Sequence, residues 1–153
     1  MNRKTVLAVL GLMMGAGYTA AACAQAKPET LVKQRQAAMV LMGKYFYGEL
    51  RPMAQGKRPY DAKIVARDTE YLDALSRMPW DGFDPRTKGV KSGALPAVIN
   101  EPAKFKEAQD RFLKEVSALV TTVKGGDESA IKNQILAVNK ACGSCHDDFR
   151  EKQ

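Results

Sequence analysis

The chain has 153 residues and a formal net charge of +7, and 27% of its residues are charged. This length is enough for one domain with a buried core. The positive residues are spread along the chain, without the basic stripe and stacking aromatic residues typical of nucleic-acid binding, so we expect no nucleic-acid partner and favour encounters with acidic proteins.

Residues 1–24 have the pattern of a secretory signal peptide. A positive start at residues 2–4 is followed by an apolar run at residues 6–14 and by a small-residue cleavage site at residues 22–24. The apolar run is too short to cross a membrane, and we expect no membrane association. A cysteine within the cleavage site leaves a lipoprotein anchor open, although the alanines before it are not the usual large aliphatic residue. We therefore expect a mature chain of residues 25–153 in the periplasm.

Four helices separated by proline and glycine breaks are expected in the mature chain. The first spans residues 29–50, with an apolar face at three- and four-residue steps, and Pro52 marks its end. The second follows residues 59–61 and runs to about residue 78. The residues expected to face inward on the first helix are Leu31, Arg35, Ala38, Met39, Met42 and Phe46. Those expected on the second are Ile64, Thr69 or Asp68, Leu72 and Leu75.

A long connection rich in glycine and proline follows, at residues 79–102. Connections of this length usually carry a function. Trp80 and Phe83 lie near its start and are expected to fold inward. The connection is therefore a candidate part of a binding site.

The third helix is expected at residues 103–124, with Phe105 and Phe112 on its inner side and two glycines at its end. Asp127 is suited to cap the fourth helix, which ends near Arg150. No segment has the pattern of a strand. One long and two short connections between four helices predict an all-α fold, an antiparallel four-helix bundle.

The fourth helix carries the motif Cys-x-x-Cys-His at Cys142, Cys145 and His146. This is the attachment pattern of c-type haem. On one helical turn the two thiols can both reach a single porphyrin, and the residue that follows points at the iron. His146 is the only histidine of the chain, and neutral imidazole is a standard ligand of haem iron. We therefore expect one covalently attached haem c per chain, with His146 as the metal ligand.

Two other kinds of site use a Cys-x-x-Cys pair, redox disulfides and zinc sites. Zinc needs further ligands, and the only other cysteine, Cys23, lies in the expected signal peptide. A redox disulfide leaves His146 unexplained. No methionine follows the motif, so any second axial ligand of the iron has to come from upstream.

Together with the motif, residues spread over the whole mature chain resemble the class II c-type cytochromes, specifically cytochrome c′. The resembling segments are residues 35–39 (Arg-Gln-Ala-Ala-Met), residues 59–61 (Pro-Tyr-Asp), Pro79-Trp80 followed by Phe83, the phenylalanines Phe105 and Phe112, and residues 141–150. The resemblance implies a four-helix bundle with a five-coordinate, high-spin haem and a homodimer that binds NO and CO. It also implies a role in NO handling or electron transfer, with an unknown redox partner.

The resemblance further implies that Met39 lies over the distal face of the haem, Arg35 near a propionate and Arg150 beside His146. Arg35 and Met39 are four residues apart, as are His146 and Arg150, and this spacing places the two members of each pair on one helical face. A buried guanidinium needs an anionic partner, which a propionate or a carboxylate from another helix would supply. Two interpretations stay open for the aromatic residues, packing on haem or packing in a bundle core. These residues are Trp80, Phe83, Phe105 and Phe112.

We expect a gas-binding haem protein, without a hydrogen-bond donor on the distal side, that is not an enzyme. A peroxidase needs a distal acid–base group, and the only histidine is committed to iron. The alternative is a six-coordinate, low-spin electron carrier in which the Met39 sulfur is the sixth ligand.

Overall fold

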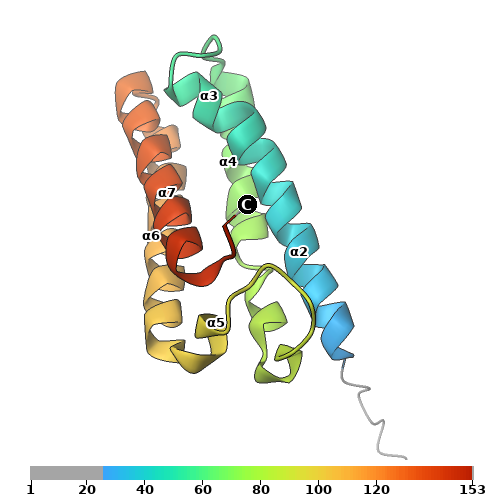
Figure 1. Ribbon diagram of the computed structural model, residues 1–153. Coiled ribbons are helices and arrows are strands. Elements are labelled where there is room, and N and C mark those ends of the chain that lie inside the picture. Colours follow the sequence, from blue (N-terminus) through green and yellow to red (C-terminus); the bar gives the residue numbers. More distant parts are fainter. Residues whose placement is uncertain (1–25, 153) are drawn as a thin grey trace, which may run out of the picture.

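Four long helical stretches run antiparallel to one another in the computed structural model, which describes residues 26–152 (Figure 1). This all-α bundle confirms the expected fold class. The expected signal peptide lies outside the described residues. The first stretch consists of α2 (Pro28–Tyr45), η1 (Phe46–Leu50) and α3 (Arg51–Ala54), and the others are α4 (Ala62–Ser76), α6 (Pro102–Gly125) and α7 (Glu128–Phe149). None of the described helices is long and apolar enough to cross a bilayer.

Short polar side chains begin two of these helices, as the sequence predicts for the last one. The Asp127 carboxylate accepts a hydrogen bond from the Ala130 backbone amide at 2.7 Å, which confirms it as the N-cap of α7. Asp61 caps α4 in the same way, through the amide of Lys63 at 2.8 Å. Gly126, with φ of 75°, ends α6 in the left-handed conformation that favours glycine.

The first helical stretch continues past Pro52, and the expectation that Pro52 ends it is wrong. The turn η1 is π-helical: the Arg51 amide donates to the Phe46 carbonyl, five residues back. Pro52 then lies in the first turn of α3, where its missing amide hydrogen is tolerated. The stretch therefore reaches Ala54.

Helix α4 ends at Ser76, two residues before the expected position, and its buried face is wider than expected. Because α4 packs against both α2 and α6, Val65 is fully buried while Ile64 and Leu75 are only half-buried. The indole nitrogen of Trp80 donates to the Ser76 carbonyl at 2.7 Å. This bond satisfies one carbonyl at the helix end and turns the chain into the long connection.

The long connection contains three short helices, η2 (Trp80–Phe83), η3 (Pro85–Thr87) and α5 (Ala97–Asn100). Helix η2 packs on α2. The segment before α5 is bonded to the end of α7, through the Leu95 amide to the Phe149 carbonyl and the Glu151 amide to the Gly93 carbonyl, both at 2.9 Å. In Figure 1 the connection, in yellow, therefore lies beside the red C-terminal end of α7.

Buried apolar side chains form two clusters. The larger one fills the bundle and includes Phe46, Leu72, Leu119 and Ile135. The smaller one, around Phe105, joins the long connection to α6 and α7. The Cys-x-x-Cys-His motif lies where the two clusters meet.

Candidate haem site

A cavity of about 650 Å³ lies between α2, α7 and the long connection. This volume is within the range of sites that hold a cofactor-sized ligand. All ten residues that the sequence analysis considered for haem binding or haem packing line this one cavity. They are Arg35, Met39, Trp80, Phe83, Phe105, Phe112, Cys142, Cys145, His146 and Arg150.

The two motif cysteines are free thiols on the cavity side of α7. Burial is the main reason that the pKa of Cys142 is raised to about 12, and the neighbouring Cys145 raises it further. A redox-active cysteine needs a lowered pKa and a thiolate near neutral pH. Cys142 therefore has the character of a buried thiol in an apolar pocket rather than that of a redox centre.

His146 is half-buried beside the same thiols, and neutral imidazole is the form of this side chain that binds iron. Burial lowers the pKa of His146, and the charge of Arg150 lowers it further, against an opposing effect of Asp147. Within residues 26–152, no group of three or more His, Cys, Asp and Glu side chains gathers to hold a bare metal ion. His146 is thus suited to be the single protein ligand of an iron that a larger cofactor carries.

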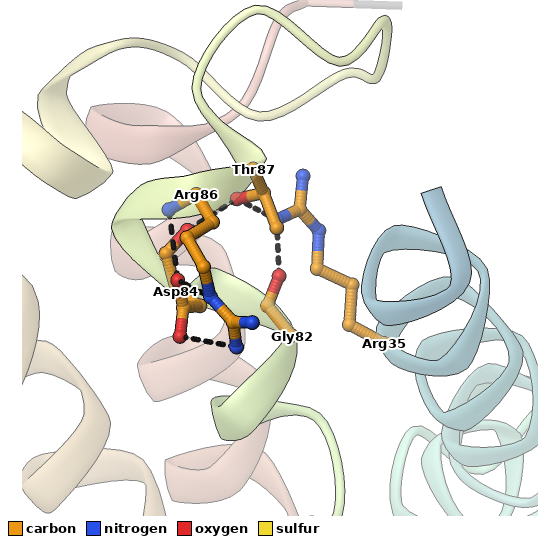
Figure 2. Close-up of polar contacts among 5 residues, drawn as sticks. All are labelled: Arg35, Gly82, Asp84, Arg86 and Thr87. Carbon is orange, nitrogen blue, oxygen red and sulfur yellow. Dashed lines mark hydrogen bonds and ion pairs between the residues drawn. The ribbon is translucent and has the colours of Figure 1, made fainter. Parts of the chain in front are cut away.

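Arg35 is 5% exposed and is held by neutral groups of the long connection. It donates hydrogen bonds to the Gly82 carbonyl and to the Thr87 hydroxyl, the latter at 3.3 Å (Figure 2). It also donates to the Ser92 hydroxyl at 2.8 Å. Its guanidinium carbon also lies 4.6 Å from the centre of the Phe83 ring. No carboxylate of the described chain forms an ion pair with Arg35.

Burial lowers the pKa of Arg35 from its ordinary value, because the charge has lost much of its water. A guanidinium remains charged in proteins, so a buried one without a protein carboxylate needs an anion from elsewhere. The cavity that Arg35 borders is the place where such an anion would lie. The Asp84 carboxylate, also drawn in Figure 2, is bonded to Arg86 and not to Arg35.

Aromatic side chains form one wall of the cavity. The rings of Phe83 and Phe105 are 4.8 Å apart between centres, and Trp80 lies 6.1 to 6.2 Å from Phe83, Phe105 and Phe112. Such distances are typical of favourable aromatic pairs. The four residues pack on one another, as a bundle core requires, and they also line the cavity, as packing on a haem requires.

The sequence analysis missed three polar residues that line the cavity: Gln36, Tyr47 and Ser92. Each carries a hydrogen-bond donor, so the cavity as a whole is richer in donors than expected. No sequence signal indicated Tyr47, because the apolar spacing of the first helix points to its neighbour Phe46. Ser92 is placed by the fold of the long connection, which periodicity does not describe.

The residues present fit a c-type haem. The walls are mainly apolar, two thiols and one imidazole face the space from a single helix, and a buried cation without a protein carboxylate borders it. These features match the porphyrin, its two thioether links, the iron and a propionate.

The comparisons with known proteins agree with this fit. Residues 30–150 match the family model described as Cytochrome C'. The chain belongs to the cytochrome c′ family. It is 40% identical over 127 residues to cytochrome c' of Rubrivivax gelatinosus, an alignment that covers 82% of this chain and 98% of that one. Membership of the family implies a c-type haem as cofactor.

Solved cytochrome c′ structures have the same fold. The crystal structure from Rubrivivax gelatinosus has a TM-score of 0.78 and 39% identity and covers 82% of this chain and 98% of its own. A nitric oxide complex of a cytochrome c prime mutant from Alcaligenes xylosoxidans has a TM-score of 0.77 and 36% identity, with 84% and 99% covered. A carbon monoxide complex of another variant has a TM-score of 0.76 and 36% identity, with 83% and 98% covered. Variants of the Alcaligenes xylosoxidans protein therefore bind both gases.

Proposed function

We propose that the chain holds one haem c through thioether bonds from Cys142 and Cys145, with His146 as iron ligand, and that it binds NO and CO. The observation that carries this proposal is that the complete Cys-x-x-Cys-His motif, Met39 and Arg35 line the same cavity. When bound, the haem supplies an iron with one open coordination position for a diatomic gas. Gas complexes of cytochrome c′ relatives support this function.

The side chains of the cavity have separate tasks in this proposal. The neutral imidazole of His146 binds the iron, and Arg150, four residues on, keeps a positive charge beside it. Arg35 binds a propionate, since it is buried without a protein carboxylate. Met39 closes the gas-binding side as a steric lid. The aromatic wall keeps water out of the cavity.

The proposed role is gas binding and electron exchange rather than enzymatic turnover. Peroxide cleavage needs an acid–base group near the bound substrate. In the described chain no aspartate or glutamate lines the cavity, and its histidine is assigned to iron. The second candidate function is that of an electron carrier with a six-coordinate haem, and Met39 favours it because this residue, which carries a thioether sulfur, lines the cavity.

We propose export to the periplasm, as the pattern of the first 24 residues indicates. We also propose a homodimer that forms through α2, η1 and α4. Six large apolar side chains of the described chain are exposed, and four of them, Val40, Leu41, Tyr47 and Tyr71, lie on these three elements. Apolar side chains gathered on one part of a surface mark an interaction site.

Mass and absorption spectra of the exported protein test the proposed function together. Denatured protein should retain the mass of one haem, and the double variant Cys142→Ala, Cys145→Ala should lose it. The ferrous protein should have a broad, unsplit visible band that changes on addition of CO or NO. Haem extracted by acid–acetone would refute the covalent link, and sharp split bands that CO leaves unchanged would establish the electron carrier instead.

A further inference from the structure

The π-helical turn η1 carries two consecutive side chains that reach the cavity. Phe46 is 2% exposed and belongs to the bundle core, and both Phe46 and its neighbour Tyr47 line the cavity. In an α-helix, consecutive side chains point about 100° apart. A turn bonded from residue i to i+5 holds more residues, so neighbours diverge less. The turn thus allows Tyr47 to reach the cavity beside Phe46, which also fills the core.

Tyr47 connects the motif with the surface. Tyr47 and Cys142 line the same cavity, and burial together with the nearby Cys142 raises the pKa of Tyr47. Its ring packs edge-on against Phe46, at 5.2 Å between centres, and the Arg51 guanidinium lies 5.4 Å from the ring centre. The side chain is 40% exposed in the single chain, so the part of it that does not face the cavity is open to solvent or, in the proposed homodimer, to the second copy.

We propose that Tyr47 is a positioning residue for the cofactor, which holds the Cys142 sulfur and covers the Cys142 edge of the cavity from water, and so raises the reduction potential of the haem. This inference rests on the proposed covalent haem. It adds a contact that lies outside the attachment motif, in a turn that the apolar pattern of the helix does not predict.

Two effects of Tyr47 act in the same direction. A hydrogen bond from the phenol draws electron density away from the sulfur, and such bonds around a cofactor tune its potential. The ring also keeps water from the cofactor edge. Water stabilises the oxidised iron, which carries more charge, better than the reduced iron. Loss of either effect should therefore lower the reduction potential.

Redox titration of the haem-loaded protein tests this inference with two pairs of variants. Tyr47→Phe removes the hydroxyl and keeps the ring, whereas Tyr47→Ala removes both. The matched controls are Tyr45→Phe and Tyr45→Ala. Tyr45 is two residues away, its ring packs at a tilt against Tyr71 with 4.9 Å between centres, and it is not among the residues that line the cavity.

At a fixed applied potential, Tyr47→Phe should raise the ratio of oxidised to reduced haem about threefold, as expected for one hydrogen bond. Tyr47→Ala should raise it about tenfold, which corresponds to about 59 mV for a one-electron couple. The Tyr45 variants should titrate like the wild type. The inference is overturned if the Tyr47 variants have the same reduction potentials as the corresponding Tyr45 variants, or if Tyr47→Phe raises the reduction potential.

Deletion of Tyr47 tests whether the π-helical turn is needed to place the Tyr47 side chain or to form the helical bundle. Because a π-helical turn holds one residue more than an α-helical turn, the deletion should convert η1 into α-helix and leave Phe46 and Leu50 in the core. We expect unchanged helical circular dichroism and a potential as low as that of Tyr47→Ala. A deleted protein that loses its helical signal would overturn the assignment of the turn to Tyr47.

The outcomes separate this inference from the proposed function. A low-spin spectrum would refute gas binding at a five-coordinate iron, and the Tyr47 titrations would still decide the inference. Exported protein without attached haem would overturn both.

Discussion

Met39 lies one helical turn after Arg35 on α2, and both side chains line the cavity. Arg35 is fixed by three hydrogen bonds to the long connection, whereas Met39 is held only by packing. A methionine side chain is flexible and fills irregular space. At the scale of single residues, the difference between a gas-binding protein and an electron carrier therefore depends on whether this sulfur binds iron or only blocks access to it.

Met39→Ala should raise the association rates of CO and NO by about tenfold if Met39 is a lid. This corresponds to relief of about 1.4 kcal/mol of steric cost. The ligand-free ferrous spectrum should remain high-spin. Stopped-flow mixing and absorption spectra measure the two quantities.

Met39→Leu is the control, because it keeps the bulk and removes the sulfur. If Met39 is a steric lid, Met39→Leu should have gas association rates close to those of the wild type. A wild-type protein that is low-spin and becomes high-spin in both variants would instead show that Met39 is a ligand.

The sequence predicted the residues of the cavity well where chemistry or helical spacing constrains them. Cys142, Cys145 and His146 follow from the motif, and Arg35 is conspicuous as a charge on an apolar helix face. Its hydrogen-bond partners, in contrast, belong to the long connection, whose path has no periodic signal. Tyr47 was missed because a π-helical turn, set by tertiary packing, places it.

Helix η2 approaches α2 closely because residue 82 is glycine. A Cβ atom added at Gly82 would lie 2.6 Å from the Cβ of Arg35 and 2.7 Å from the Leu31 carbonyl oxygen. The same residue supplies the carbonyl that accepts a hydrogen bond from Arg35. At the scale of elements, this contact fixes the long connection on the bundle and places Trp80 and Phe83 of η2 at the cavity.

Gly82→Val should destabilise the protein by about 1–3 kcal/mol, the usual cost of forcing extra carbon atoms into a packed contact. Urea denaturation of the haem-loaded protein measures this. Gly125→Val is the control, since an added Cβ at Gly125 meets nothing within 4 Å. Equal midpoints for the two variants would show that η2 moves freely away from α2.

Element boundaries show which signals in the sequence are reliable. The Asp127 cap and the glycine end of the third helix were predicted correctly, because each acts through local geometry within a few residues. Pro52 was misread, since a proline ends a helix only where an amide hydrogen is needed. The short helices within the long connection were not predicted, because three or four residues are too few to show a period.

For the whole molecule, the antiparallel bundle was predictable from the number of helices and the lengths of their connections. The association of two copies is not encoded in such a pattern. It depends on which side chains stay exposed after the bundle has formed. Leu41 on α2 is 42% exposed and Leu136 on α7 is 39% exposed, so the two leucines are closely matched in residue type and exposure.

Leu41→Glu should convert the proposed homodimer largely to monomer, because it introduces a charge into an apolar contact between two copies. We expect the dissociation constant to rise about tenfold or more, in the range of a contact that contributes over 1 kcal/mol to binding. Leu136→Glu should leave the dimer intact, since α7 is not part of the proposed interface. Sedimentation velocity at micromolar concentration distinguishes the two species. A wild-type protein that sediments as a monomer would refute the dimer. If instead only Leu136→Glu dissociates it, the interface lies on α7 rather than on the side formed by α2, η1 and α4.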